Sequence, residues 1–381
     1  MNLSPEEKQI GKDNFFEAVG TTRRDFLKQS IVATVAAGSA TSLGAYYFKY
    51  DKVNEPLRVG IIGTGDEGGV LIGALNPDYI DVVAIADIRP YSLHRAFYGD
   101  TYSPGAMSAR PGLLEVYKGE GWVDRSQAEK HITVYQDGYQ ELIDDPRVEA
   151  VIIALPLHLH HEAAIAAMRA GKHVLTEKLM AHNIGQCKEM GRVAASTGKI
   201  LGVGHQRHYS ILYDNAVEQI KQGLIGDLHH IRAQWHRGNL PGNDSWQPPL
   251  PEAKDYSFEQ FNRDLAATSD SARSAFAAAH PLYSQLRSWK GRLNDAIKNG
   301  PAKDIDLWSK RIAQTEAQLA DIDVQAEKYL YETKQLPMRT RTALEELIRW
   351  RLWDRTGGGL MAELGSRQLD AASFFIAADP R

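Results

Sequence analysis

The chain has 381 residues, of which 43% are hydrophobic and 24% charged, which is typical of a globular protein with about two domains. Its 44 basic and 48 acidic side chains give a net charge of −4, so no excess of positive charge favours nucleic acid or an anionic membrane as a partner. A single cysteine, Cys187, excludes an internal disulfide and a thiolate metal cluster. We therefore expect no nucleic-acid partner and no metal site.

The first fifty residues have the pattern of a targeting segment. Residues 22–28 read TRRDFLK, and a modest apolar run rich in alanine and glycine follows. This order is typical of an export signal rather than of a membrane-spanning helix. The segment resembles the twin-arginine signal, whose translocase reads both arginines, here Arg23 and Arg24. The resemblance implies that residues 1–50 are a signal and linker that direct export to the periplasm, either cleaved or retained as an anchor. An ordinary amphipathic helix is the alternative.

A short apolar strand beginning at Leu57 runs into a glycine-rich turn, in the sequence LRVGIIGTGDEGG. In a dinucleotide-binding turn the first glycine permits the bend, the second lets the pyrophosphate approach, and the third lets the helix pack on the strand. The glycines at this spacing are Gly63, Gly65 and Gly68.

A second predicted strand, over residues 81–86, ends in Asp87, about 20 residues beyond the turn. At this position a carboxylate accepts hydrogen bonds from the adenine-ribose diol, which favours NAD. Arg89, two residues further on, could instead bind the 2′-phosphate of NADP. A strand-end cap is the other interpretation of Asp87.

Three further strands are predicted over residues 150–155, 173–176 and 200–204, with helices over 161–170 and 183–197 between them. Strands that alternate with helices indicate a parallel sheet with helices on both faces. We therefore predict an α/β domain over residues 55–210, a Rossmann doubly wound parallel sheet. Ligands of such sheets bind beyond the carboxyl ends of the strands. The candidate residues at these ends include Pro156, His160, Glu177, Lys178 and His205.

Two of these strand ends resemble motifs of the Gfo/Idh/MocA oxidoreductase family. ALPLHLHHE is similar to the TPxxxH turn of the family, and TEKL is similar to its EKP motif, with Leu179 in place of proline. The resemblance implies that Pro156, His160 and Glu177 belong to the cofactor site. It also implies that Lys178 lies beside the nicotinamide, where an ammonium can stabilise a developing alkoxide. The alternatives are a solvated Lys178 and a His160 that only satisfies backbone groups.

Residues 211–381 are predicted to form an incomplete α+β second domain. A helix over 211–222 and a strand over 227–236 resemble the crossing into the second domain of the family, an open antiparallel sheet that binds substrate. Residues 237–251 are rich in turn formers and predict a loop. Much of 258–350 has apolar residues at three- and four-residue spacing, which predicts an inserted helical hairpin for packing or homo-oligomer contact.

A glycine run near the end of the chain, GGGLMAELGSRQLD, resembles the GGxxxDxxxH helix of the family. Glu363 stands at the acid position and Arg367 at the histidine position, and their four-residue spacing puts both on one helix face. An arginine stays protonated at neutral pH and cannot act as a titrating base. We therefore expect Glu363 and Arg367 to bind substrate, with Tyr209 and His205 as candidate proton carriers. An internal Glu363–Arg367 ion pair is the alternative.

Together these features predict an oxidoreductase that uses NAD, with NADP as the alternative cofactor, and transfers hydride from a sugar or cyclitol-like hydroxyl. Two alternatives stay open. One is an NAD-dependent glycoside hydrolase that oxidises its sugar transiently and eliminates the aglycone. The other is a non-catalytic protein that binds NAD or a sugar. The chain stops at Arg381, soon after the glycine run, whereas family members continue with further strands, which favours a C-terminally truncated second domain.

Overall fold

The computed structural model describes residues 55–235, 246–267, 269–359 and 361–378. The predicted signal with Arg23 and Arg24 lies outside these residues, as does most of the loop predicted over 237–251. In the part of the chain that is described, no helix has the length and apolar character needed to cross a membrane.

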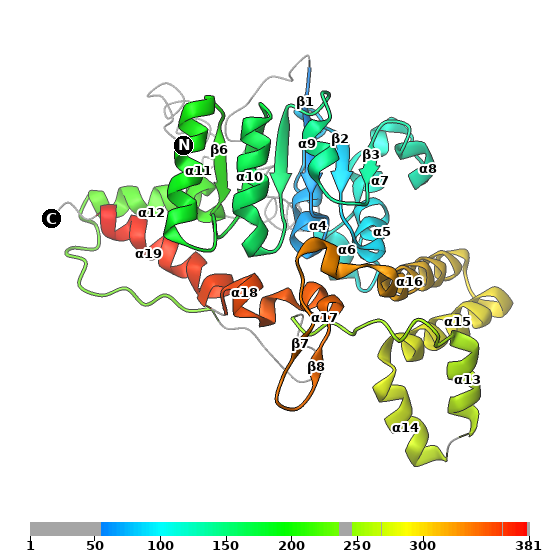
Figure 1. Cartoon of the computed structure of the whole chain (residues 1–381). Helices are drawn as coiled ribbons and strands as arrows, with labels where there is room; N and C mark the ends of the chain where they lie inside the picture. Colours follow the sequence, from blue (N-terminus) through cyan, green and yellow to red (C-terminus); the bar gives the residue numbers. More distant parts are fainter. Residues whose placement is uncertain (1–54, 236–245, 268, 360, 379–381) are drawn as a thin grey trace, which may run out of the picture.

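A six-stranded parallel sheet forms the centre of the first half, with its strands in the order β3-β2-β1-β4-β5-β6 (Figure 1). The first strand, β1, lies in the middle of the sheet, and the later strands are added on both sides of it. This is the strand order of a doubly wound Rossmann sheet. The predicted fold class is thereby confirmed. The strands are β1 (Leu57–Ile62), β2 (Ile80–Ala86), β3 (Thr133–Tyr135), β4 (Ala150–Ile153), β5 (His173–Glu177) and β6 (Leu201–Gly204).

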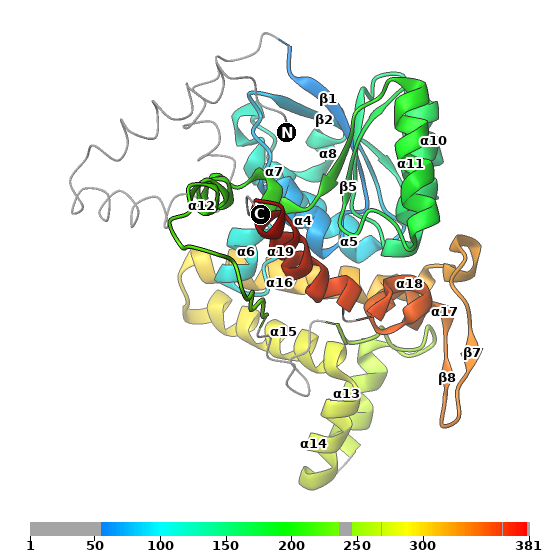
Figure 2. The ribbon, with the colours of Figure 1, turned by 90° about the vertical axis from the view of Figure 1, so that its left-hand side faces the viewer.

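Helices cover both faces of this sheet because successive strand residues point to opposite sides. Ile61 of β1 belongs to a buried cluster with Ile72 and Phe97, whereas its neighbour Ile62 belongs to a second cluster with Met168. Figure 2 shows α10 and α11 side by side on one face. The helices of this half are α4 (Asp66–Gly73), α5 (Pro90–Tyr98), α6 (Pro104–Ala109), α7 (Leu113–Val116), α8 (Arg125–Ala128), α9 (Gln140–Asp144), α10 (His160–Arg169) and α11 (Ile184–Thr197).

The described residues of the second half are mostly helical, with one short antiparallel hairpin formed by β7 (Lys334–Gln335) and β8 (Thr340–Arg341). Helices α13 and α14 extend away from the sheet, and α15 and α16 pair with each other (Figure 1). The helices are α12 (Ile211–Lys221), α13 (Phe258–Ala267), α14 (Asp270–Ala279), α15 (Pro281–Asn299), α16 (Ala302–Ala320), α17 (Ala343–Ile348), α18 (Asp354–Gly357) and α19 (Ser366–Ala378).

One sequence prediction in this half is wrong, and another holds over most of its range. The strand predicted over 227–236 does not form in its described part, residues 227–235, where no neighbouring strand offers it backbone partners. The helices predicted over 258–350 form as far as Ala320, with α15 and α16 as the predicted hairpin. Turns and a short antiparallel hairpin then follow before helix returns in α17. The backbone of Leu330, with φ at 67°, lies in the left-handed region, which a continuing helix cannot accommodate.

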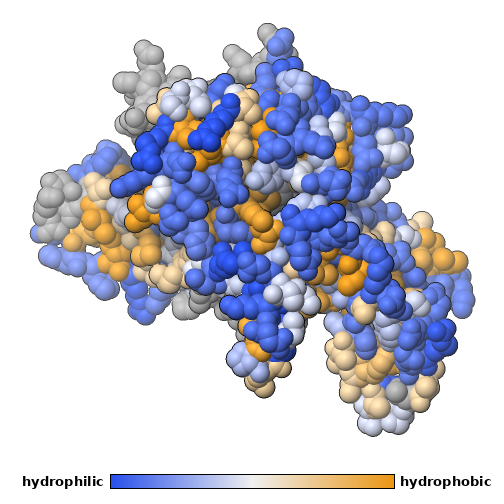
Figure 3. Space-filling model, viewed as in Figure 1, coloured by the Kyte–Doolittle hydropathy of each residue, from blue (hydrophilic) through white to orange (hydrophobic). Residues whose placement is uncertain are grey.

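The second half contacts the first through several of its helices. Helix α16 packs on α5, α18 packs on the turn that follows β4, and α19 contacts the turn that follows β6. Within the second half, α19 also lies along α12 (Figure 1). Figure 3 shows apolar surface at the end of the molecule formed by α12 and α19. Three side chains there are more than half exposed: Leu212, Leu369 and Ile376. The carboxyl edge of the sheet therefore faces helical elements of the second half.

Candidate functional site

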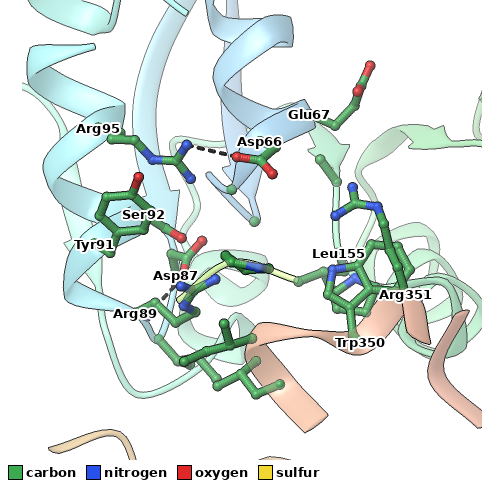
Figure 4. A pocket seen from close by; sticks show the side chains of 18 of the residues that line it. Asp66, Glu67, Asp87, Arg89, Tyr91, Ser92, Arg95, Leu155, Trp350 and Arg351 are labelled. Carbon is green, nitrogen blue, oxygen red and sulfur yellow. Dashed lines mark hydrogen bonds and ion pairs between the residues drawn. The ribbon is translucent and has the colours of Figure 1, made fainter. Parts of the chain in front are cut away.

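A cavity of about 940 Å³ lies along the carboxyl edge of the sheet, between the Rossmann layer and the second half. Most of the predicted site residues line it: Gly63, Gly65, Asp87, Arg89, Pro156, Glu177, Lys178, Glu363 and Arg367. Figure 4 shows Asp87 and Arg89 on one side of this space and Trp350 and Arg351 on the other. The cavity is thus built from both halves of the chain.

The glycine turn between β1 and α4 has the geometry that its sequence predicts. Gly63 has a φ of +87°, and a Cβ there would lie 2.6 Å from the carbonyl oxygen of Ala154. A Cβ on Gly68 would lie 2.2 Å from the carbonyl oxygen of Gly63. A Cβ on Gly65, in contrast, would meet no atom within 4 Å. The backbone at Gly65 is therefore open to a ligand at the N-terminus of α4, where phosphate groups bind.

Asp87 follows β2, and backbone groups hold its carboxylate in place. Its Oδ2 accepts a hydrogen bond from the N–H of Thr64 (2.7 Å), and its Oδ1 accepts one from the N–H of Arg89 (2.9 Å). Burial raises the pKa of Asp87, although both hydrogen bonds oppose this shift. A fixed pair of acceptor oxygens facing the cavity fits the diol of a ribose.

The first turn of α4 carries a second carboxylate, on Asp66. Its Oδ1 accepts a hydrogen bond from Arg95 (2.8 Å), which Figure 4 shows as a dashed line. Burial works against ionisation, yet Arg95 and Arg351 hold the pKa of Asp66 well below its usual range. The negative charge of Asp66 is thus offset by arginines. Three features of the site therefore fit a dinucleotide cofactor: the open glycine turn, the acceptor oxygens of Asp87, and the arginines that neutralise Asp66.

Lys178 lies directly after β5, and its peptide bond to Leu179 is cis. Its Nζ donates to the backbone carbonyl of Glu363 (2.7 Å) and to Glu363 Oε2 (3.2 Å). The other oxygen, Oε1, accepts from Nε of Arg351 (2.9 Å). Burial lowers the pKa of Lys178, while Glu363 works in the opposite direction. The predicted lysine and the predicted acid therefore meet, and Arg351 completes a row of three charged groups.

Glu363 belongs to a single π-helical turn, Met361–Gly365, which precedes α19. Such turns are frequent at functional sites because they redirect side chains that a regular helix would place elsewhere. Burial favours the neutral form of Glu363, but Arg351 and Lys178 hold its pKa below the usual range. Glu363 is therefore an anion that fixes the position of the lysine.

Glu177, the last residue of β5, also faces the cavity. Burial, aided by the charge of Glu67, raises the pKa of Glu177 to about 7. The absence of a side chain at Gly204 makes room for it, because a Cβ there would lie 2.9 Å from Glu177 Oε1. A carboxyl group with this pKa can exchange a proton at neutral pH.

Arg367 lines the cavity but does not pair with Glu363 in the described part of the chain. Its Nη2 lies 3.9 Å from Oε1 of Glu67, and its guanidinium carbon lies 5.7 Å from the ring centre of Trp235. Arg367 therefore offers a guanidinium to the cavity, held by a weak ion pair.

His160 lies behind the cavity and is 1% exposed. Its ring nitrogens lie 2.7 Å from the carbonyl oxygen of Leu179 and 2.8 Å from that of Leu155. It thus ties together the turns that follow β4 and β5, the backbone role that the sequence left open for it. Gly68 likewise acts through packing of α4 rather than by lining the cavity.

The two candidate proton carriers are not brought to the cavity. The Tyr209 hydroxyl donates to the backbone carbonyl of Val203 (3.1 Å), and the side chain is about half exposed. Nδ1 of His205 lies 3.6 Å from Oδ2 of Asp370 on α19. The Tyr209 side chain therefore folds back onto β6, whereas His205 faces α19.

Tyr331, Trp350 and Arg351 are among the cavity-lining residues that the sequence did not identify. The motif WRLWDRTGGG contains two of them directly before the glycine run, so their position there was an available signal. Tyr331 comes from the turn before β7 and gave no such signal. Among the described residues, no group of three or more His, Cys, Asp or Glu side chains could hold a metal ion.

Curated relatives of this chain include both hydrolases and reductases. A glycosyl hydrolase family 109 protein of Solibacter usitatus is 26% identical over 266 residues, which cover 64% of this chain and 52% of that protein. The 1,5-anhydro-D-fructose reductase of Ensifer adhaerens is 36% identical over 160 residues, covering 42% and 44%. The myo-inositol 2-dehydrogenase of Thermotoga maritima is 28% identical over 197 residues, covering 51% and 47%. The chain spans about half the length of these relatives.

The match to a family model covers the Rossmann layer. Residues 57–205 match the Gfo/Idh/MocA oxidoreductase family, described as an NAD-binding Rossmann fold. The matched segment contains the glycine turn, Asp87 and Lys178, which the structure brings to one cavity. Residues 57–205 of the chain therefore form an NAD-binding Rossmann domain of the Gfo/Idh/MocA oxidoreductase family.

Proposed function

We propose that the protein is an NAD-dependent oxidoreductase that acts on a hydroxyl group of a sugar or cyclitol by hydride transfer. The observation that carries this proposal is the buried ammonium of Lys178, which shares one cavity with the glycine turn and Asp87. The substrate class is supported by the names of two relatives, a 1,5-anhydro-D-fructose reductase and a myo-inositol 2-dehydrogenase.

NAD, when bound, supplies the hydride acceptor. Lys178 donates a hydrogen bond to the reacting oxygen and stabilises the negative charge that develops as hydride leaves the carbon. Glu363 and Arg351 hold this ammonium in place. Glu177, with its pKa raised to about 7 by burial, accepts the hydroxyl proton. The products are a ketone, the reduced cofactor and a proton.

The variant Lys178→Met tests this proposal because it removes the ammonium and keeps most of the apolar stem. We expect hydride exchange to fall by about 100-fold or more, the usual cost of one such electrostatic contact, while NAD affinity changes little. Lys188→Met, on the exposed surface of α11, is the matched control. A Lys178→Met protein that oxidises polyols as fast as the parent contradicts hydride transfer and leaves the binding-protein alternative.

A second candidate function is supported by the relative whose match covers 64% of this chain, a glycosyl hydrolase family 109 protein. In this reaction the sugar would be oxidised transiently, the aglycone eliminated, and the hydride returned after water adds. A nitrophenyl glycoside distinguishes the two functions. Release of nitrophenol without accumulation of reduced cofactor supports the hydrolase, whereas accumulation of NADH with a free polyol supports the dehydrogenase.

We also propose that residues 1–50 direct export to the periplasm through the twin-arginine translocase. The support is the sequence pattern around Arg23 and Arg24. In a fusion of residues 1–50 to a periplasmic reporter, replacement of both arginines by lysine should abolish delivery. Delivery by the variant at the unchanged level contradicts the proposal.

A further inference from the structure

The helical part of the second half reaches back to the nucleotide end of the cavity. Gln314 of α16 is buried, and its Oε1 accepts from the N–H (2.8 Å) and the hydroxyl (2.6 Å) of Thr101. Its Nε2 donates to Oδ1 of Asp100 (2.9 Å), and Nε of Arg311 donates to the carbonyl of Thr101 (2.8 Å). Because buried polar groups that are fully paired specify one arrangement, α16 docks on the cofactor domain in a defined position.

Asp321, which directly follows α16, is completely buried. Its Oδ2 accepts hydrogen bonds from Nε (2.9 Å) and Nη2 (2.7 Å) of Arg89, and its Oδ1 accepts from the N–H of Tyr91 (3.0 Å). The side chain of Arg89 is 15% exposed and lines the cavity. The arginine that follows β2 is therefore both held and neutralised by a residue of the second half.

The other arginines near this end of the cavity are also paired. Arg95 binds Asp66 (2.8 Å) and Asp100 (3.2 Å), and Arg110 binds Asp100 (2.9 Å). Asp87 adds a further carboxylate at the position that faces the ribose. Four carboxylates, on Asp66, Asp87, Asp100 and Asp321, thus accompany these three guanidinium groups. The guanidinium of Arg311, which also lines the cavity, is bound to the backbone carbonyls of Thr101 and Tyr102. A 2′-phosphate requires a cation that is free to meet it, and these pairs leave none of the three arginines uncommitted.

We propose that Asp321 makes the cofactor site selective for NAD over NADP. Asp321 holds the guanidinium of Arg89 and neutralises its charge. The carboxylate of Asp87 then sets which group binds at the 2′ position, because it accepts hydrogen bonds from a hydroxyl and repels a phosphate. The inserted helices are then a part of the nucleotide site and not simply a packing element. This inference rests on the cofactor assigned in the proposed function, and it adds a specificity-determining residue that lies outside the Rossmann domain.

Calorimetric titration of the full chain with NAD and with NADP tests the inference without any substrate. We expect the parent protein to bind NAD more tightly. In Asp321→Asn the guanidinium of Arg89 loses its counter-charge, so NADP affinity should rise by about tenfold or more relative to NAD affinity. In the double variant Asp321→Asn, Arg89→Gln this gain should vanish, because no cation is left to release.

Asp323→Asn is the matched control, since it removes the same charge from the same turn at an exposed carboxylate that pairs with Lys254. Asp321→Ser, which keeps an acceptor for the N–H of Tyr91, replaces the asparagine variant if the latter fails to fold. An unchanged NADP to NAD ratio in both Asp321 variants, or an equal change in Asp323→Asn, overturns the inference. A parent protein that prefers NADP overturns it as well. Binding of neither dinucleotide overturns the cofactor site itself.

Discussion

The ammonium of Lys178 binds two oxygens of the same residue, the backbone carbonyl (2.7 Å) and Oε2 (3.2 Å) of Glu363. These residues lie 185 positions apart, one at the end of β5 and the other in the turn before α19. Their contact joins the Rossmann domain to the second half at the end of the cavity where we place hydride transfer. The charge state of the lysine therefore depends on a residue that the Rossmann domain does not contain.

Removal of this partner should make Lys178 more acidic. Burial already lowers the pKa of Lys178 and Glu363 opposes that shift, so Glu363→Gln should lower the pKa further. Reaction of Lys178 with acetic anhydride, followed by mass spectrometry across pH, should accelerate at a lower pH in the variant. Lys188 on the exposed surface of α11 serves as the internal control. A labelling profile of Lys178 that stays where it is in the parent would show that Glu363 does not act on it.

Glu177 should make stability depend on pH. Burial raises its pKa to about 7, above the value in the unfolded chain, so its contribution is complete at acidic pH and is lost as the pH rises through about 7. Glu177→Gln cannot ionise, so its unfolding free energy relative to the parent should increase by about 2 kcal/mol between pH 5 and pH 8. Urea unfolding at both pH values measures this difference. The exposed control Glu141→Gln should show no such change, and a constant difference for Glu177→Gln contradicts the assigned pKa.

Alanine substitutions at two glycines of the turn should have different effects, one on NAD binding and the other on the stability of the fold. A Cβ on Gly65 meets no atom within 4 Å, so Gly65→Ala should change the unfolding free energy by less than about 0.5 kcal/mol. The same methyl group occupies the approach of a pyrophosphate, so NAD affinity should fall by about tenfold or more. Gly68→Ala should instead destabilise the fold by about 1–3 kcal/mol, because its Cβ would overlap the carbonyl of Gly63. Thermal unfolding and NAD titration measure both effects, and unimpaired NAD binding by Gly65→Ala would place the cofactor elsewhere.

Asp87→Ala should weaken NAD more than NADP. The carboxylate accepts hydrogen bonds from the free diol of NAD, whereas it repels a 2′-phosphate. Loss of hydrogen bonds to a charged acceptor costs about 1.5–3 kcal/mol, so NAD affinity should fall by roughly 10- to 100-fold. Asp87→Asn keeps an acceptor for the N–H of Thr64 and separates the loss of charge from the loss of local structure. Calorimetric titration with both cofactors gives the comparison, and equal losses would remove Asp87 from the ribose site.

The Rossmann domain and its cofactor-site residues could be predicted because each of their sequence patterns spans only a few residues. The strand ends before Asp87 and Lys178 and the glycine spacing after β1 each depend on a few consecutive residues. Alternating strands and helices form a parallel sheet, and the carboxyl ends of parallel strands lie at the same edge. The residues that follow these strands are therefore brought together.

The pairings that complete the site could not be predicted in this way. Asp321 lies 232 positions from its partner Arg89, and nothing in the turn after α16 identifies that partner. The strand predicted over 227–236 failed for the related reason that alternation of apolar residues needs a neighbouring strand, and the described residues provide none. Tyr209 and His205 do not line the cavity because the Tyr209 hydroxyl binds the carbonyl of Val203 in β6 and His205 faces Asp370 of α19.

The pairing of Arg89 with Asp321 also sets an order of events during synthesis. The sixth strand of the sheet is complete at Gly204, so all strands of the Rossmann layer have left the ribosome long before Asp321 emerges. Until then the guanidinium of Arg89 lacks its counter-charge, and an uncompensated buried charge costs several kcal/mol. We therefore expect the nascent nucleotide domain to keep the segment around Arg89 open to water until α16 and Asp321 have been made.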